Sequence, residues 1–124
     1  MTASPIPGPP TERILHSMDR QSLAFRSARD AGEASLAVTG EIDMFTAESL
    51  YERVSGLVGA STSVLVLDLG GVTFCDSLGV AALVRIYRYT TDLGCRVRLT
   101  NLREHVAHIL HISGLDQVFE VETA

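Results

Sequence analysis

The strongest constraint on the fold of this chain is a strand-helix-strand succession in its middle. Val64–Leu69 is apolar at both parities apart from Asp68, which is typical of a strand covered on both faces inside a sheet. A helical pattern follows over Leu78–Asp92, and Gly94 is placed to end that helix. Cys95–Thr100 then alternates apolar and charged residues, which predicts a half-exposed strand near an edge. Two strands joined through one helix run parallel, so this segment predicts an α/β domain.

A predicted hairpin and a predicted helix precede this unit. Ser22–Ser27 and Ala34–Thr39 are strand-like, and the turn-rich link Arg29–Glu33 between them indicates an antiparallel pair. A second helix is predicted over Thr46–Leu57, with Thr46 as its N-cap. The hairpin makes the predicted sheet mixed rather than wholly parallel.

The C-terminal part of the chain repeats the strand-helix pattern. Leu102–Ile112 is predicted to be a helix that Gly114 ends, and Val118–Val121 can add a last short strand. A length of 124 residues suits one domain with one core. We therefore predict a single α/β domain with a mixed sheet of four to five strands, an N-terminal hairpin and repeated strand-helix units.

The N-terminal residues and the overall charge limit the function classes. Residues 1–21 carry all four prolines and only a weak helical spacing near Thr11–Arg20, so we expect a flexible tail before a domain at residues 22–124. A net charge of −5 offers no basic surface for nucleic acid or anionic membranes. No apolar run approaches a bilayer span and no secretory signal is visible, so we expect a cytoplasmic protein whose partners are proteins.

The two cysteines are predicted to remain free thiols. Cys75 precedes the helix of the central unit, and Cys95 begins the strand that follows that helix. In parallel strands these positions lie at opposite ends of the sheet, beyond the reach of a disulfide. Cys75 is expected to be a small buried residue, although a helix N-terminus can lower a thiol pKa and favour a redox role.

Metal binding is poorly supported by the sequence. The densest set of possible ligands lies on one predicted helix at a spacing of three residues: His105, His108 and His111. This spacing turns around the helix and no facing Cys or carboxylate completes a tetrahedral set, so a solvated helix face is the better interpretation. An acidic cluster forms only if the strand ends carrying Asp43, Asp68 and Asp76 meet, and solvated or capping carboxylates are the commoner outcome.

The pair Asp76-Ser77 stands at the corner between the central strand and its helix. Either side chain could cap the helix, because Asp and Ser both accept hydrogen bonds from the first free backbone N–H groups. The chain has no Gly-x-Ser-x-Gly elbow, no P-loop and no identifiable base for Ser77. The corner is therefore better interpreted as a surface that presents Ser77 as the substrate of a kinase.

The chain resembles the STAS domain of bacterial anti-sigma factor antagonists over Leu23 to Val121. Four segments carry the resemblance in order and spacing: Gly40-Glu41-Ile42-Asp43, the apolar strand through Asp68-Leu69, Val72-Thr73-Phe74-Cys75-Asp76-Ser77-Leu78-Gly79, and Ile112-Ser113-Gly114-Leu115. Leu78 stands where a second Ser often precedes Gly79 in this family.

The resemblance implies a role for each matching residue. Ser77 would be the phosphate acceptor, with Asp76 beside it at the docking site and Asp43 contributing to partner binding. Leu78 and Gly79 complete the implied partner-binding set.

The resemblance also implies a mechanism. An unphosphorylated antagonist of this kind binds an anti-sigma factor that is a serine kinase, which frees a sigma factor for transcription. Phosphorylation releases the antagonist and a serine phosphatase resets it, with ATP and metal held by those partners and no cofactor in the antagonist. Two alternatives stay open: a STAS scaffold or ligand-sensing module without covalent control, and a small α/β enzyme with Ser77 or Cys75 as nucleophile.

Overall fold

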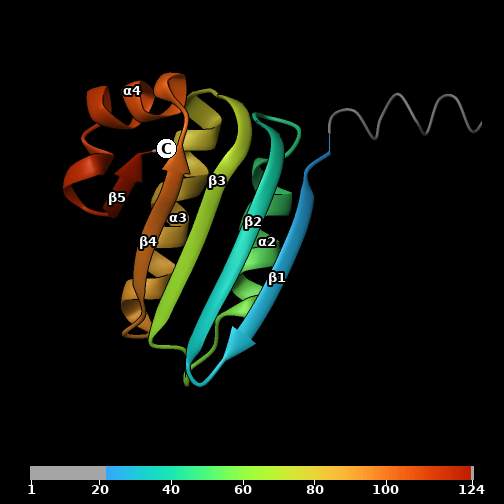
Figure 1. The fold of residues 1–124 in the computed structure, drawn as a ribbon, viewed down its shortest axis with the longest axis vertical. Helices are drawn as coiled ribbons and strands as arrows, with labels where there is room; N and C mark the ends of the chain where they lie inside the picture. The colour runs from blue at the N-terminus through green and yellow to red at the C-terminus, as the bar shows by residue number, and fades with distance from the viewer. Residues whose placement is uncertain (1–21, 124) are drawn as a thin grey trace, which may run out of the picture.

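A five-stranded sheet organises residues 22–123, the part of the chain that the computed structural model describes (Figure 1). The elements in chain order are β1 (Ala24–Asp30), β2 (Glu33–Ile42), α2 (Ala47–Leu57), β3 (Val64–Cys75), α3 (Ser77–Asp92), β4 (Arg96–Leu102), α4 (Glu104–Ile112), the 3-10 turn η1 (Leu115–Gln117) and β5 (Glu120–Thr123). The strands lie in the order β1-β2-β3-β4-β5, with β1 antiparallel to β2 and the other pairs parallel. The predicted mixed α/β sheet is confirmed, while the predictions for residues 1–21 lie outside the described residues.

The hairpin between β1 and β2 is tighter than the sequence predicts. Asp30 pairs with Glu33, so Ala31 and Gly32 alone form the turn. Both have positive φ angles, 49° and 88°, which is the geometry of the two-residue turns that match strand twist. Ala31 therefore adopts a conformation that glycine usually occupies, and β2 starts one residue earlier than its apolar pattern suggests.

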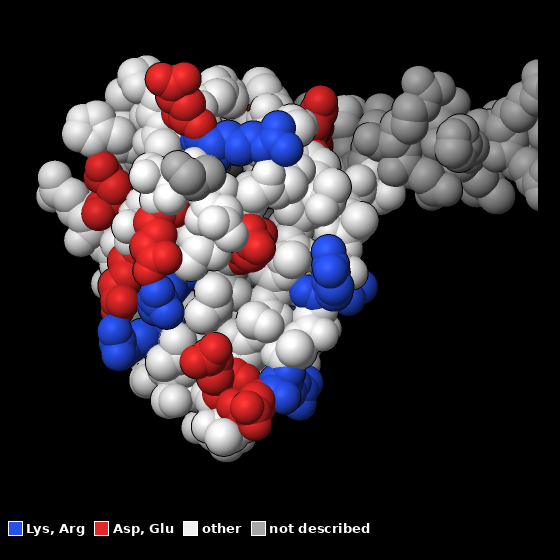
Figure 2. Space-filling view, viewed as in Figure 1, with Lys and Arg blue, Asp and Glu red and all other residues white. Residues whose placement is uncertain are grey.

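Helices cover one face of the sheet within the described residues. Figure 1 shows α2 and α3 behind the strands, and Figure 2, seen from the same side, shows charged side chains gathered mainly around the margin of the opposite face. Along β3, Leu65, Leu67 and Leu69 are fully buried whereas Val66 and Asp68 are only partly buried. The prediction that this strand is covered on both faces is wrong, because its second parity points to the face that lacks these helices.

β3 is also longer than its apolar run, and this extension positions the candidate site. The strand continues past the predicted end at Leu69, through Gly70 and Gly71. A Cβ on Gly71 would lie 2.5 Å from Thr39 Oγ1, so only glycine lets β3 pass β2 at their shifted register. The bulged pairing carries β3 on to Cys75, next to Ile42 at the end of β2.

The C-terminal boundaries also shift. Leu102 belongs to β4 and not to the helix, because Asn101 at φ 59° turns the buried Leu102 side chain into the core before α4 begins. β5 begins at Glu120 because η1 intervenes and Phe119 is buried ahead of the strand. The half-exposed, near-edge character predicted for β4 is confirmed, since it alternates buried and more exposed residues and lies beside the edge strand β5.

Helix ends follow the glycine signals in the sequence. Gly94 and Gly114 both have φ 76° and directly follow the C-caps of α3 and α4, as predicted. The longest helix of residues 22–123 is α3, with 16 residues. In this range no helix combines the length and the apolar character needed to cross a membrane.

Candidate functional site

Asp76 caps the helix that begins at Ser77. Its Oδ1 accepts hydrogen bonds from the backbone N–H groups of Leu78 and Gly79, both at 2.9 Å. Two of the free N–H groups at the start of α3 are thus satisfied by one carboxylate oxygen. Ser77 occupies the first helical position, is exposed, and makes no hydrogen bond to a described residue. The Asp side chain therefore has the capping role that sequence alone leaves open, and the Ser77 hydroxyl is not engaged by any residue of the range 22–123.

The first turn of α3 lies against the end of β2. The Asp76 N–H donates to the carbonyl of Ile42 at 3.1 Å, which joins the two strand ends. A Cβ on Gly79 would lie 2.6 Å from that same carbonyl oxygen and 2.7 Å from the Cys75 Sγ. Gly79 is buried, so it supports the site from beneath, whereas Leu78 is exposed beside Ser77. The absence of a side chain at Gly79 thus allows the first turn of α3 to pack closely on the strand end.

The neighbouring corner between β2 and α2 holds Asp43 in place. Asp43 Oδ1 accepts from the Phe45 N–H at 2.9 Å, and the Asp43 N–H donates to Thr46 Oγ1 at 2.9 Å. The Thr46 hydroxyl donates in turn to the Glu41 carbonyl at 2.7 Å. Thr46 is the N-cap residue of α2, as predicted, but its side chain makes no capping hydrogen bond, because the hydroxyl points back to the strand end.

Exposed apolar side chains surround the two corners. Four of the six large apolar residues that are exposed among residues 22–123 lie there, and we call them the apolar group: Met44 (64% exposed), Phe45 (62%), Phe74 (40%) and Leu78 (48%). A shallow groove of about 230 Å³ runs between α2 and α3 from Met44 and Leu78 toward Arg85. Clustered exposed apolar surface of this kind marks sites of protein interaction.

Sequence reasoning missed Met44 and Phe45. They lie between Asp43 and Thr46, where the chain has neither a strand period nor a helix period. Two consecutive apolar residues in an aperiodic corner are the available signal, but only the folded chain shows that both side chains are exposed.

The cation beside this groove is already paired. Arg85 on α3 donates to Glu48 on α2 at 2.7 Å, and its guanidinium carbon lies 3.9 Å from the centre of the Tyr51 ring. The hydrogen bond to Glu48 raises the pKa of Arg85 above its ordinary value, so the group is a fixed positive charge. The carboxylates of Asp43 and Asp76 at the corners have no such cation within the described residues.

Neither Ser77 nor Cys75, the two predicted candidate nucleophiles, is activated by a described residue. Ser77 makes no hydrogen bond to a described base. Burial, together with the charge of Asp76, raises the pKa of Cys75 to about 11, which is the opposite of activation by a helix N-terminus. Both cysteines are free and buried, and they lie at opposite ends of the sheet as predicted, because β4 begins beside Val64 at the far end of β3.

The candidate acidic and histidine ligands stay apart. Asp68 lies in the middle of β3, where its Oδ1 accepts from the Gly70 N–H at 2.9 Å, so it does not join Asp43 and Asp76. His105 stacks on Phe74 with ring centres 5.9 Å apart, while His111 Nδ1 lies 2.8 Å from Asp116 Oδ2. Across residues 22–123, no three His, Cys, Asp or Glu side chains are grouped to hold a metal ion.

Comparison with known proteins places this fold and site in a class. A family model described as "Mlab, STAS domain" matches residues 25–121. The chain therefore belongs to the STAS domain family, as its motifs predict.

Relatives of known role narrow the class. The chain is 31% identical over 103 residues to the anti-sigma-F factor antagonist RsfB of Mycobacterium tuberculosis, covering 81% of each chain. It is 27% identical over 94 residues to an anti-sigma-B factor antagonist of Listeria monocytogenes, covering 76% of this chain and 82% of the relative. The solved structure of an anti-sigma factor antagonist from Mycobacterium paratuberculosis superposes with a TM-score of 0.72 at 26% identity, over 82% of this chain and 86% of that one. Within the STAS family, the chain groups with the anti-sigma factor antagonists.

Proposed function

We propose that this protein binds an anti-sigma factor serine kinase when Ser77 is unphosphorylated, and so releases a sigma factor for transcription in the cytoplasm. Phosphorylation of Ser77 by that kinase ends the binding, and a serine phosphatase restores it. The observation that carries the proposal is an exposed Ser77 hydroxyl that is bonded to no described residue and lies beside the exposed Leu78 of the apolar group. The printed names of the relatives, antagonists of anti-sigma-F and anti-sigma-B factors, supply the class of partner.

The apolar group and the two carboxylates would form the contact surface. Leu78, Met44 and Phe45 offer apolar area that a partner can bury. In Asp43 and in Asp76, only Oδ1 is engaged by described residues, so each carboxylate keeps one oxygen to accept a partner's hydrogen bond. Gly79, which is buried, contributes by holding the first turn of α3 against β2.

A phosphate on Ser77 would change this surface without breaking the helix. It adds about −1.5 to −2 charges, and the helix dipole partly favours them. The N–H groups of Leu78 and Gly79 are already bonded to Asp76, and Arg85 is already paired with Glu48. The added charge would therefore remain hydrated at the surface, where burying it against the partner's apolar contacts is costly.

The test uses the full chain with candidate anti-sigma kinases and ATP, followed by mass spectrometry of the modified residue. We expect phosphate on Ser77, no phosphate in Ser77→Ala, and binding by Ser77→Glu at least about tenfold weaker than by the native protein. Ser61→Glu, an exposed substitution in the loop between α2 and β3, is the matched control and should bind as the native protein does. Phosphate on other residues only, with native binding by Ser77→Glu, would contradict the proposal.

A STAS scaffold without covalent control is the second candidate. It is favoured by the apolar group, which can dock a partner whether or not Ser77 is modified. Equal partner binding by the native protein, Ser77→Ala and Ser77→Glu would support this candidate over the phosphorylation switch.

A further inference from the structure

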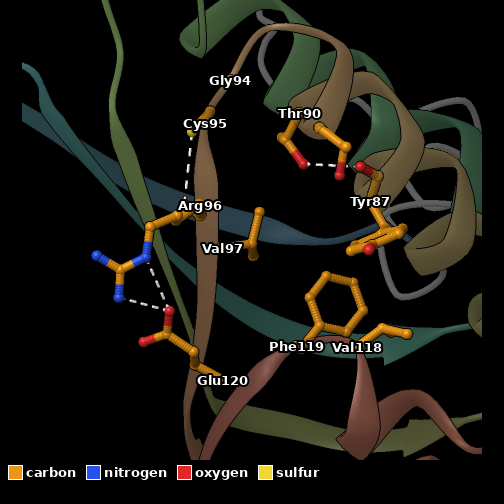
Figure 3. A pocket seen from close by; sticks show the side chains of 10 residues that line it. Tyr87, Thr90, Gly94, Cys95, Arg96, Val97, Val118, Phe119 and Glu120 are labelled. Carbon is orange, nitrogen blue, oxygen red and sulfur yellow. Dashed lines mark hydrogen bonds and ion pairs between the residues drawn. The ribbon is translucent and has the colours of Figure 1, made fainter.

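A cavity lies at the other end of α3 from Ser77. It has a volume of about 300 Å³, is open to solvent on one side, and is lined by the last turns of α3, the start of β4 and the segment Val118–Glu120 (Figure 3). The 16 residues of α3 span about 24 Å, so this cavity is separate from the surface around Ser77. Its size is at the lower end of the range for small-molecule pockets.

The inner wall of the cavity is apolar and contains aromatic rings. Cys95, Val97 and Phe119 line it and are all buried. The rings of Tyr87 and Phe119 meet edge to face, with centres 5.6 Å apart and planes at 83°, and Figure 3 shows both beside Val97. Burial also raises the pKa of the Cys95 thiol, so this side of the wall carries no charge at neutral pH. Such a wall favours an apolar or aromatic ligand body.

The polar groups of the cavity differ in whether they are already satisfied. The Thr90 hydroxyl donates to the Ile86 carbonyl at 2.8 Å within its own helix. Arg96 makes two hydrogen bonds to Glu120 Oε2, at 2.9 and 2.6 Å, and Figure 3 shows this pair on the other side of β4 from Val97 and the two rings. The Tyr87 hydroxyl, in contrast, has no hydrogen bond to a described residue. The hydroxyl of the exposed Thr91 also has no hydrogen bond to a described residue, but of the two residues only Tyr87 belongs to the aromatic wall, so its hydroxyl is the one placed to orient a ring bound there.

We propose that this cavity binds a small, uncharged aromatic molecule whose single polar group exchanges a hydrogen bond with the Tyr87 hydroxyl. The buried wall accepts the ring, and it offers no charge to an ionised ligand, because the charged lining residues Arg96 and Glu120 are paired with each other on the other side of β4. The proposal is independent of phosphorylation and of the partner surface.

Chemical-shift titration of the full chain with three probes tests the assignment. The probes are 4-methylphenol, toluene and 4-methylbenzoate, which share one ring and differ in a hydroxyl, no polar group and a negative charge. We expect 4-methylphenol to bind most tightly and 4-methylbenzoate at least about tenfold more weakly, with shifts concentrated at residues 87–97 and 118–120. Shifts spread over the whole chain, or none with millimolar probe, would overturn the proposal.

Two tyrosines on the same helix give a matched pair of variants. Tyr87→Phe should weaken 4-methylphenol about fivefold and leave toluene unchanged, because only the free hydroxyl is lost. Tyr89→Phe is the control, since the Tyr89 hydroxyl bonds to the Ser55 and Val58 carbonyls away from the cavity. Equal effects of the two substitutions on 4-methylphenol would overturn the role assigned to Tyr87.

Discussion

The corners β2–α2 and β3–α3 use the same residue types in opposite ways. Each has an aspartate followed by a hydroxyl residue at the start of a helix, Asp43 with Thr46 and Asp76 with Ser77. At the first corner the hydroxyl is 1% exposed and is bonded to two backbone groups. At the second corner the hydroxyl is exposed and makes no hydrogen bond to a described residue.

The role of each hydroxyl depends on its position relative to the helix cap. Thr46 occupies the N-cap position of α2, where its hydroxyl turns back to the strand end. Ser77 follows a cap that Asp76 already provides, so its side chain is not needed by the backbone. The same functional group therefore has a structural role at the N-cap position of α2 and remains exposed at the first helical position of α3.

The largest expected effect comes from the glycine beneath the second corner. Gly79→Ala should lower the free energy of unfolding by about 3 kcal/mol, because the new Cβ would meet the Ile42 carbonyl at 2.6 Å. Gly56→Ala in α2 is the control, since a Cβ there meets nothing within 4 Å, and it should stabilise the protein by about 0.5 to 1 kcal/mol. Urea unfolding measures the stability of both variants. Equal stabilities of Gly79→Ala and Gly56→Ala would show that the first turn of α3 is not packed tightly against β2.

We expect the protein to lose stability at high pH because of the Cys75 thiol at the second corner. The pKa of Cys75 is raised from 9.0 to about 11 in the folded protein, so the folded state holds the proton more tightly than the unfolded state. The stability that the protonated thiol contributes is therefore fully present below pH 9 and is lost as the pH rises through 11. We expect the free energy of unfolding to fall by about 2 to 3 kcal/mol over this window. Unfolding of the native protein and Cys75→Ser should be compared across this window. A decline that is equally steep in the variant would exclude Cys75 as its cause.

The two hydroxyls can be compared directly. Thr46→Val keeps the shape of the side chain but leaves the Asp43 N–H without its acceptor, so we expect a loss of about 2 kcal/mol. Ser77→Ala should change stability by less than about 0.5 kcal/mol, because no described contact is lost. Thermal or denaturant unfolding of both variants gives the comparison. A large loss in Ser77→Ala would mean that its hydroxyl has a structural role.

Loss of the cap should destabilise the protein less than Gly79→Ala or Thr46→Val does. Asp76→Ala removes the acceptor of the Leu78 and Gly79 N–H groups and should cost about 1 kcal/mol. Asp76→Asn retains a side-chain oxygen and should lose less. Denaturant unfolding of both variants tests the assignment, and native stability in Asp76→Ala would transfer the capping role to another group.

Much of the fold could be predicted from local patterns. The helix over Leu78–Asp92 and its end at Gly94 were visible because a 3.6-residue period and a C′ glycine act within one element. The extension of β3 through Gly71 was not visible, because its cause is the approach of Thr39 from another strand. Leu102 likewise changed element because of the backbone conformation at Asn101.

The candidate site could be predicted only in part, because local patterns do not show hydrogen bonding or exposure in the folded chain. The sequence placed Asp76 and Ser77 at a helix start, but both residue types can cap, and only the hydrogen bonds of the folded corner distinguish them. Met44 and Phe45 carry no periodic signal, so their exposure had to come from the structure.

Periodicity and motif spacing are properties of neighbouring residues, so the alternation of strands and helices, the family and the serine at the start of α3 can be recognised from the chain alone. The folded chain was needed to show that the end of β2 meets the first turn of α3, that Gly79 is buried while Leu78 is exposed, and that the Ser77 hydroxyl is bonded to no described residue. Exposure and hydrogen bonding at a corner depend on which distant strand lies beside it, and strand register is fixed by the whole sheet.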